Sequence, residues 1–275
     1  MRYYAMAVYA FLYFPIALIV GYSFNEGRYA MDWQGFSFQW YAVAWNNPLV
    51  MEALETSLII AGGTAIISVI VGTAAALGLE RLRSNWIRQI FDGLIYTAII
   101  VPGIVIGIAT LVACVTVFDL VNPLLTAAFG ERTPRLRLGI WTVIAAHVLF
   151  NLAVVTLVVR TRLQSLDRNL IEAAEDLYAT PFGTFRQVVL PLLLPSIVAG
   201  GLLAFTFSLE DYIITSFVAG PYSTLPIYVF ASIRRGVTPE INAIGTVILV
   251  ASFSLLLIAQ RLMRKSERKA AELPA

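Results

Sequence analysis

Few side chains in this sequence combine charge with an apolar setting. Two adjacent carboxylates, Glu210 and Asp211, end a long apolar run and precede Tyr212. A carboxylate that faces hydrocarbon is costly, so it needs water, a partner charge or a cation. The pair could attract a cationic solute, with the ring of Tyr212 giving cation–π contact, or it could lie in water just beyond the run. Adjacent residues of a helix point about 100° apart, so at most one is expected to face a pathway.

A second polar pair, His147 and Asn151, lies in another apolar run. Residues four apart share one helix face, and polar groups within a membrane usually face the bundle interior. The pair could join two helices by hydrogen bonds or could line a pathway. His147 is the one histidine of the chain, so neither a multi-histidine metal site nor a histidine-based catalytic triad is expected. Pro102 predicts a kink in a third run, either as a hinge near the pathway or as ordinary packing.

The composition indicates that a membrane positions these groups. The 275 residues are 59% hydrophobic and 13% charged, about half the charged fraction of a soluble domain. Cys114 is the one cysteine and lies in an apolar run, so no disulfide is expected. The sequence therefore predicts an all-α polytopic membrane protein. Its six transmembrane helices are expected near residues 5–24, 56–79, 93–117, 138–160, 192–212 and 240–260.

The segments between these helices are expected to form a surface helix, two loops and an irregular stretch. A short helix on the membrane surface is expected within 25–52, where tryptophan and tyrosine are frequent. Residues 80–92 read as a basic loop, residues 118–137 as a polar loop, and residues 213–237 as amphipathic and irregular. Small residues throughout 56–79 predict a helix at the centre of the bundle, because they let backbones approach closely.

The stretch 169–195 is amphipathic and reads as structured. Thr180 followed by Pro181 is a helix-start signal, which predicts two short helices at about 169–178 and 181–190. Pro191 and Pro195 would stiffen the exit into the fifth span. Such a hairpin could insert an apolar knob of Phe182 and Phe185 into a partner's groove, or it could lie on lipid. Glu172 could hold its shape by pairing with Arg160, Arg162 or Arg168.

Basic residues predict the orientation and exclude one kind of enzyme. Of the 19 lysines and arginines, the outer loops hold Arg28, Arg132, Arg135, Arg137, Arg234 and Arg235. The remainder lies at the N-terminus, in the even loops and in the tail, so both termini and the stretch 169–195 are expected in the cytoplasm. A P-loop needs a lysine after a glycine-rich turn. Lys265 and Lys269 are the two lysines and lie in the tail, so the chain is not expected to hydrolyse ATP.

The stretch 169–195 resembles the EAA loop of ABC importer permeases. The residues that carry this resemblance are Glu172, Ala173, Ala174, Phe185, Leu190 and Pro191, and the coupling role that it implies is also expected of Leu177 and Phe182. In that family the loop forms a coupling helix that docks on an ATPase subunit. The family usually has glycine where this chain has Tyr178. A tyrosine in the left-handed conformation costs roughly 1–2 kcal/mol, which favours a corner built in another way.

Trp40-Tyr41, Asn46-Asn47 and 58–79 resemble the run-in and first core helix of the same family. The segments 207–211 and 236–243 resemble the permease subunits of spermidine/putrescine importers. The resemblance implies the type I ABC importer permease fold and a polyamine solute. A related organic cation, an anion or a sugar remains open as the solute. The implied parts are a first helix and periplasmic segment at 1–55, a five-helix core at 56–265 with the coupling loop at 160–191, and a tail at 266–275.

The resemblance also implies partners and a location. The chain would lie in the bacterial inner membrane, in lipid, beside a second and homologous permease chain. Two ATPase subunits would use the ATP, and a periplasmic binding protein would deliver solute. No cofactor, metal, nucleic acid or catalytic residue is implied for this chain.

Two other classes are weighed. An ion-coupled secondary carrier usually needs inverted repeats and a midplane ion site, which this sequence does not display. An intramembrane enzyme is disfavoured by the single histidine, the single cysteine and the lack of an intramembrane carboxylate cluster.

Overall fold

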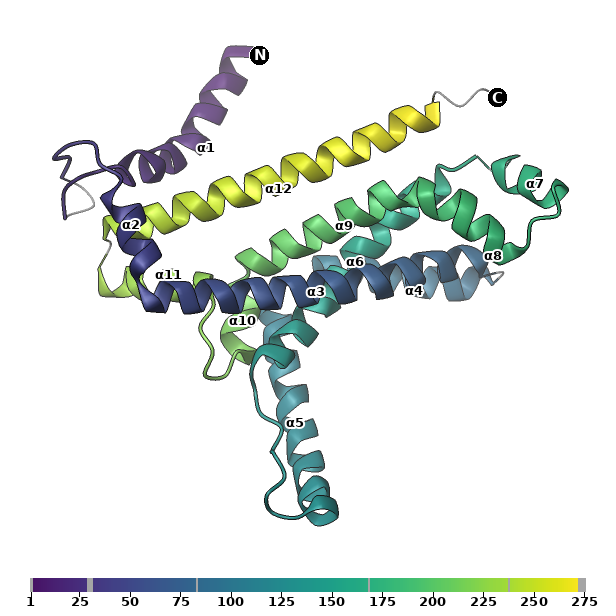
Figure 1. Ribbon diagram of the computed structural model, residues 1–275, viewed down its shortest axis with the longest axis horizontal. Coiled ribbons are helices and arrows are strands. Elements are labelled where there is room, and N and C mark those ends of the chain that lie inside the picture. Colours follow the sequence, from purple (N-terminus) through teal and green to yellow (C-terminus); the bar gives the residue numbers. More distant parts are fainter. Residues whose placement is uncertain (1, 29–31, 83, 168, 237, 272–275) are drawn as a thin grey trace. The chain divides into compact units, whose positions relative to one another are not determined.

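The computed structural model describes residues 2–28, 32–82, 84–167, 169–236 and 238–271 (Figure 1). Over these residues the chain is helical apart from turns, loops and one isolated bridge between Asn25 and Phe36. It forms two compact units, each made of two segments: Met1–Ser57 with Ser223–Ser254, and Leu58–Tyr222 with Leu255–Ala275.

The first unit contains three complete helices and parts of two long ones. The complete helices are α1 (Arg2–Tyr22), α2 (Gln39–Asn46) and α11 (Leu225–Arg235); the long ones are α3 (Pro48–Arg81) and α12 (Pro239–Ala271). Its core consists of Ala44, Val50, Ala53, Leu225 and Ile244. The amide of Asn47 donates to the hydroxyl of Tyr228 at 3.2 Å and to Oε1 of Glu240 at 2.8 Å. These bonds join the start of α3 to α11 and α12.

The second unit holds the remaining helices. These are α4 (Asn85–Ile100), α5 (Gly103–Phe129), α6 (Ile140–Gln164), α7 (Asn169–Asp176), α8 (Pro181–Thr184), a π-helical turn (Phe185–Val189), α9 (Leu190–Glu210) and α10 (Ile213–Val218). Helices α6 and α9 run side by side (Figure 1). Their core contains Val155, Val159, Leu193 and Ile197. A Cβ on Gly72 of α3 would lie 2.9 Å from Cγ1 of Val155, so glycine permits this close approach to α6.

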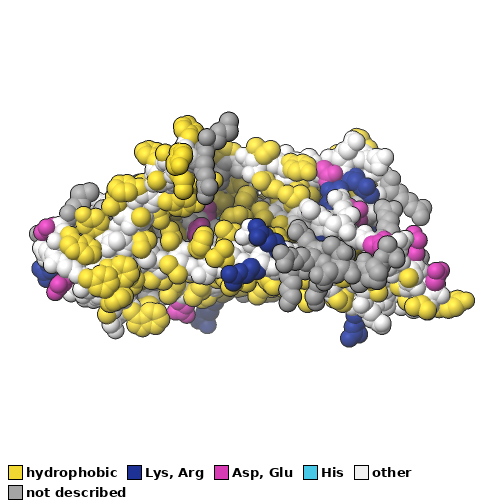
Figure 2. All heavy atoms as spheres, turned by 90° about the horizontal axis from the view of Figure 1, so that it is seen from above, with side chains coloured by type: hydrophobic (Ala, Val, Ile, Leu, Met, Phe, Trp, Pro, Cys, Tyr) yellow, Lys and Arg dark blue, Asp and Glu magenta, His cyan; other side chains and the backbone are white. Residues whose placement is uncertain are grey.

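Six of the described helices are long and apolar enough to cross a membrane. They span Tyr3–Tyr22, Pro48–Arg81, Gly103–Phe129, Ile140–Gln164, Pro181–Glu210 and Pro239–Arg264. Figure 2 shows one face of the molecule, on which hydrophobic side chains predominate. An exposed apolar surface of this kind is suited to lipid or to other membrane chains.

Several expected boundaries are wrong. The basic loop at 80–92 is largely helical, because α3 continues to Arg81 and α4 begins at Asn85. The span expected at 93–117 is broken rather than kinked, since Val101 is extended and Pro102 caps α5. Helix α5 then runs to Phe129, well into the loop expected at 118–137, and ends where Gly130 adopts a φ of 87°. Pro123 lies inside α5 without ending it, and the helix stops only at the left-handed Gly130.

The hairpin at 169–195 also differs from expectation. Helix α8 passes through the π-turn directly into α9, so Pro181 to Glu210 is one continuous helical rod. Pro191 lies in the first turn of α9, where its missing N–H costs little. The expected separate helix at 181–190 is therefore the beginning of the fifth span.

Candidate functional site

A pocket of about 400 Å³ lies within the second unit, where α4, α5, α6, α9 and α10 meet. Four residues singled out in the sequence line it: Pro102, His147, Asn151 and Asp211. They come from three different stretches of the chain, and the packing of α6 against α9 and α10 brings them together. The rings of Phe150 and Phe207 form an apolar wall, with centroids 5.9 Å apart in an edge-to-face arrangement.

The imidazole of His147 is 1% exposed and both of its nitrogens are engaged. Nδ1 lies 2.7 Å from the hydroxyl of Ser208. Nε2 lies 3.2 Å from Oδ2 of Asp211 and 3.0 Å from the hydroxyl of Thr215. The neutral tautomer that fits these contacts carries its proton on Nε2 and accepts from Ser208 at Nδ1.

Asp211 is held by the start of α10. Its Oδ2 accepts from the backbone N–H of Thr215 at 2.8 Å and from the Thr215 hydroxyl at 2.9 Å. The backbone N–H of Ile214 lies 3.4 Å from Oδ1, which leaves that oxygen with capacity for a further donor. Burial raises the pKa of Asp211, but the contact with His147 and the Thr215 hydrogen bonds outweigh it and lower the pKa below its usual value. The carboxyl is therefore ionised at neutral pH.

Asn151 adds an unsatisfied acceptor. Its side chain is 2% exposed, and its amide donates to the carbonyl of His147 at 3.0 Å. Among the described residues its Oδ1 has no hydrogen-bond partner. A buried acceptor left unpaired costs about 1–3 kcal/mol, so a donor brought by a solute would be stabilised there. The pocket thus offers one carboxylate, one amide oxygen and two aromatic rings.

Glu210 and Tyr212, the sequence neighbours of Asp211, lie outside the pocket. Glu210, the last residue of α9, is exposed and does not line the pocket. Tyr212 is half-buried and does not line it either. The aromatic face expected from Tyr212 is provided instead by Phe150 and Phe207.

The corner between α7 and α8 is built on Tyr178 itself. Among the residues that the structure describes, Tyr178 is the one non-glycine residue with a left-handed backbone, at a φ of 59°. The N–H of Ala179 donates to the carbonyl of Ala174 at 3.0 Å, which is the 6→1 bond of a Schellman motif. The expectation of a different corner was wrong, because this bond holds the tyrosine in the conformation that glycine would adopt more cheaply. Thr180 then caps α8 by accepting from the N–H of Gly183 at 3.1 Å.

The coupling candidates divide into exposed and packed residues. Leu177, Tyr178 and Phe182 are 82%, 96% and 70% exposed, and Glu172, Ala173 and Pro191 are also exposed. Ala174 is buried, while Phe185 and Leu190 pack partly against the core shared by α6 and α9. Leu177, Tyr178 and Phe182 thus form an exposed apolar tip, while Ala174, Phe185 and Leu190 are packed at its base.

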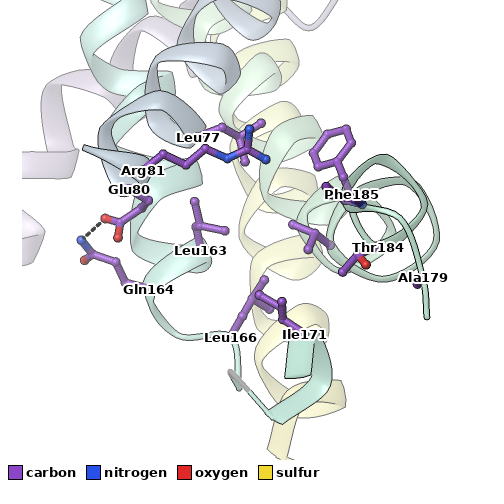
Figure 3. A pocket seen from close by; sticks show the side chains of 12 residues that line it. Leu77, Glu80, Arg81, Leu163, Gln164, Leu166, Ile171, Ala179, Thr184 and Phe185 are labelled. Atoms are coloured by element: carbon purple, nitrogen blue, oxygen red, sulfur yellow. Dashed lines mark hydrogen bonds between the residues drawn. The ribbon is translucent and has the colours of Figure 1, made fainter. Parts of the chain in front are cut away.

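A second hollow, of about 590 Å³, lies at the base of this tip (Figure 3). Phe185 and Thr184 line it from one side, and the ends of α3 and α6 line it from the other. The amide of Gln164 donates to Glu80 at 2.7 Å, drawn as a dashed line in Figure 3. The coupling stretch is thus anchored beside the ends of two spans.

Two of the three arginines expected to pair with Glu172 bind other groups. Arg160 binds Glu80 and Asp92, and Arg162 donates to the carbonyl of Leu192 at 3.4 Å. Arg168 lies outside the described residues. Among the described residues no ion pair includes Glu172, and its side chain is exposed.

Comparison with known proteins agrees with this architecture. Residues 48–272 match the family described as the binding-protein-dependent transport system inner membrane component. The chain belongs to this family. Among its relatives is the spermidine/putrescine transport system permease protein PotC of Haemophilus influenzae, 37% identical over 94% of each chain. The putrescine transport system permease protein PotI of Escherichia coli is 40% identical, over 95% of this chain and 89% of that one.

Solved structures give the same fold for this permease. A bacterial ABC transporter that imports the acidic polysaccharide alginate superposes with a TM-score of 0.70, at 15% identity and over 96% of this chain and 95% of that one. A chain of the MetNI methionine ABC transporter superposes with a TM-score of 0.55, at 15% identity and over 80% and 99% of the two chains. The expected fold class and the family resemblance are therefore confirmed.

Sequence reasoning missed several residues of the permease pocket. Ser208 and Thr215 hold His147 and Asp211 in place, and Phe150 supplies an aromatic wall. Hydroxyl residues and phenylalanines are common in apolar helices, so composition alone does not mark them. A helical spacing from Asp211 to Thr215, with a hydroxyl four residues after a carboxylate, was the one local signal.

Proposed function

We propose that this permease subunit moves a polyamine, such as putrescine or spermidine, in an ATP-driven importer that receives its solute from a binding protein. The observation that carries the proposal is the pairing of an ionised carboxylate, Asp211, with the unsatisfied Oδ1 of Asn151 in one pocket. Both groups accept hydrogen bonds, and a primary ammonium group donates three. The names of the polyamine permeases among its relatives support the same solute class.

In this account the pocket recognises the charge and the methylene chain of the solute separately. An ammonium group binds Asp211 and Asn151, and its charge also faces the rings of Phe150 and Phe207, where cation–π contact is favourable. The methylene groups contact the apolar wall. His147, held in place by Ser208, orients the carboxylate of Asp211. Glu210 is an exposed charge that attracts cations at longer range.

The coupling stretch accounts for the link to ATP. Leu177, Tyr178 and Phe182 present an apolar tip that fits a groove on an ATPase subunit, the helix-in-groove mode of recognition. Because Pro181–Glu210 is one rod, a push on α8 is transmitted to the end of α9 that bears Asp211. Closure of two ATPase subunits on ATP would thereby switch the pocket between the two sides of the membrane. This subunit performs no covalent chemistry and holds no cofactor.

The proposed assembly contains two ATPase subunits, a second homologous permease chain and a periplasmic binding protein. The chain lies in the inner membrane with both termini and the coupling loop at 160–191 in the cytoplasm, as the distribution of arginines indicates. Residues 1–55 supply a first helix and periplasmic segment to a core at 56–265, followed by a tail at 266–275. An ion-coupled carrier remains the alternative in principle, but the comparisons favour the importer permease.

Two experiments test the proposal. The tagged chain is purified from detergent-solubilised native membranes and its partners are identified by mass; a P-loop ATPase and a second permease are expected. Radiolabelled putrescine is then offered to cells with the complete transporter and to matched cells that lack this chain. Uptake should be lost with the chain, and spermidine should compete whereas a neutral sugar should not. Equal uptake by both strains, or competition by the sugar, would contradict the proposed solute.

A further inference from the structure

A cluster of charges around Arg160 joins the last turns of α3 and α6 to the middle of α4. The Arg160 side chain is 13% exposed, and its Nε lies 3.1 Å from Oε1 of Glu80. Its guanidinium also contacts both oxygens of Asp92, with Nη2 at 3.4 Å from Oδ2. Bidentate contact of this kind fixes direction as well as distance. One buried cation is thus shared by a carboxylate of α3 and a carboxylate of α4.

Helix α4 contributes no buried side chain to the second unit. None of its 16 residues is buried, and the core of the second unit takes its side chains from other segments. In the part of the chain that the structure describes, the Arg160–Asp92 contact is the hydrogen-bonded ion pair between α4 and another helix, and Arg88 of α4 adds an electrostatic attraction to Glu80 of α3. Helix α4 therefore lies along α6 by surface packing and one ion pair.

The far end of α4 forms part of the polar pocket. Ile99 and Ile100 line it, followed by Val101 and Pro102, where the helix breaks before α5. Ile99 lies about two helical turns beyond Asp92. Because the helix is rigid and ends in a break, a tilt of α4 about its contact with α6 moves this wall.

Helix α6 completes the arrangement. It carries Arg160 near one end and the pocket residues His147 and Asn151 further along. A contact between Arg160 and Asp92 therefore sets α4 in position against the same helix that bears the polar groups of the pocket. Glu80 differs, because it links α3, rather than α4, to α6.

We propose that the Arg160–Asp92 ion pair is a latch that holds α4 closed against the pocket, and that Arg160 is a positioning residue for solute passage. Its effect on uptake rests on the proposed function; its effect on the position of α4 does not. Release of the latch opens the wall formed by Ile99 and Ile100. Restoring the pair with opposite charges closes it again.

The conformational part is tested with a single thiol. In the full transporter with Cys114→Ala, Ile99→Cys is labelled by a membrane-impermeant methanethiosulfonate, and the rate is compared between variants. Asp92→Asn should raise the labelling rate at least threefold, whereas Glu80→Gln should change it less than twofold. The swap Asp92→Arg with Arg160→Asp, made in the Glu80→Gln background so that the new carboxylate meets no repulsion, should restore the original rate. An unchanged rate in Asp92→Asn, or an equal rise in Glu80→Gln, overturns the latch.

The functional part is tested by the ratio of solute moved to ATP hydrolysed. Asp92→Asn should keep ATP hydrolysis within twofold of the parent but lower this ratio at least threefold, and the swap should recover it. Altered labelling with an unchanged ratio would refute the role of Arg160 in transport. If the unmodified transporter moves no polyamine at all, the proposed function fails while the labelling result still decides the latch.

Discussion

Replacing Asp211 with asparagine removes the charge from the pocket while preserving its shape. The substitution is isosteric, and asparagine is as good a partner for helix N-terminal N–H groups as aspartate. With its one amide oxygen in the place of Oδ2, asparagine can keep the 2.8 Å hydrogen bond from the N–H of Thr215 and gives up only the longer contact from the N–H of Ile214 at 3.4 Å. The fold of α10 should be retained, so a loss of transport would report on the charge.

The magnitude follows from the burial of the group. The Asp211 side chain is 20% exposed, so solvent screens it only in part. A hydrogen bond to a charged group contributes about 1.5–3 kcal/mol, and 1.4 kcal/mol corresponds to a factor of ten. Asp211→Asn should therefore lower the uptake of a polyamine by roughly 10- to 100-fold. Glu210→Gln is the matched control, because an exposed charge contributes about 0–1 kcal/mol.

The assay is the initial rate of putrescine uptake at saturating binding protein, in membranes that contain equal amounts of assembled transporter. Under these conditions delivery of solute is constant, and the rate reflects its acceptance by the permease. The expected order is parent, then Glu210→Gln within about fivefold, then Asp211→Asn far below both. Parental uptake in Asp211→Asn, or an equal loss in Glu210→Gln, would refute the assignment of the solute site to this pocket.

Three further predictions follow from the site and the coupling stretch. Glu172→Lys should insert in the membrane normally but lower co-purification of the ATPase severalfold, because it reverses an exposed charge beside the tip; normal recovery and uptake would remove Glu172 from the docking surface. Tyr178→Gly should keep the corner and increase the free energy of unfolding by up to about 1 kcal/mol, since glycine adopts the left-handed conformation without the cost of a side chain. Tyr178→Val should instead lower the amount of ATPase that co-purifies. Equal recovery of the ATPase with valine and with glycine would argue against a left-handed backbone at this position. Because the pKa of Asp211 is lowered, its charge and the stability that the charge adds are present above the ordinary carboxyl pKa, and they are lost only as the pH falls through the still lower pKa of the folded state. The ratio of parental to Asp211→Asn uptake should therefore stay constant from about pH 5.5 to 8. A ratio that falls to one near pH 6 would contradict an ionised carboxylate.

The sequence predicted the spans well because hydrophobic length is a strong local signal. It failed where a helix boundary depends on what surrounds it. The segment 80–92 carries arginines and read as a loop, yet Asp92 pairs with Arg160 and allows α4 to lie along α6. The break at Pro102 was read as a kink, because a proline announces a disturbed helix but not how far the two halves diverge.

The pocket shows a similar limit. His147 and Asn151 could be placed on one face of a helix from their spacing, and Asp211 was recognised as a costly charge. That these residues line the same cavity could not be derived, because 64 positions separate His147 from Asp211 and only tertiary packing joins them. At Tyr178 the local rule correctly gave the cost of the left-handed backbone. It could not show that the bond from Ala179 to Ala174 would hold that conformation.

The central claim is that this chain forms part of an ATP-driven pathway for polyamines. Its most direct test is uptake of radiolabelled putrescine by proteoliposomes that contain the purified permease pair, the ATPase subunits and the binding protein. The account predicts accumulation that requires hydrolysable ATP and that stops when a non-hydrolysable analogue replaces it. Counterflow of putrescine through this chain alone, without ATP or partners, would contradict the account and favour a secondary carrier.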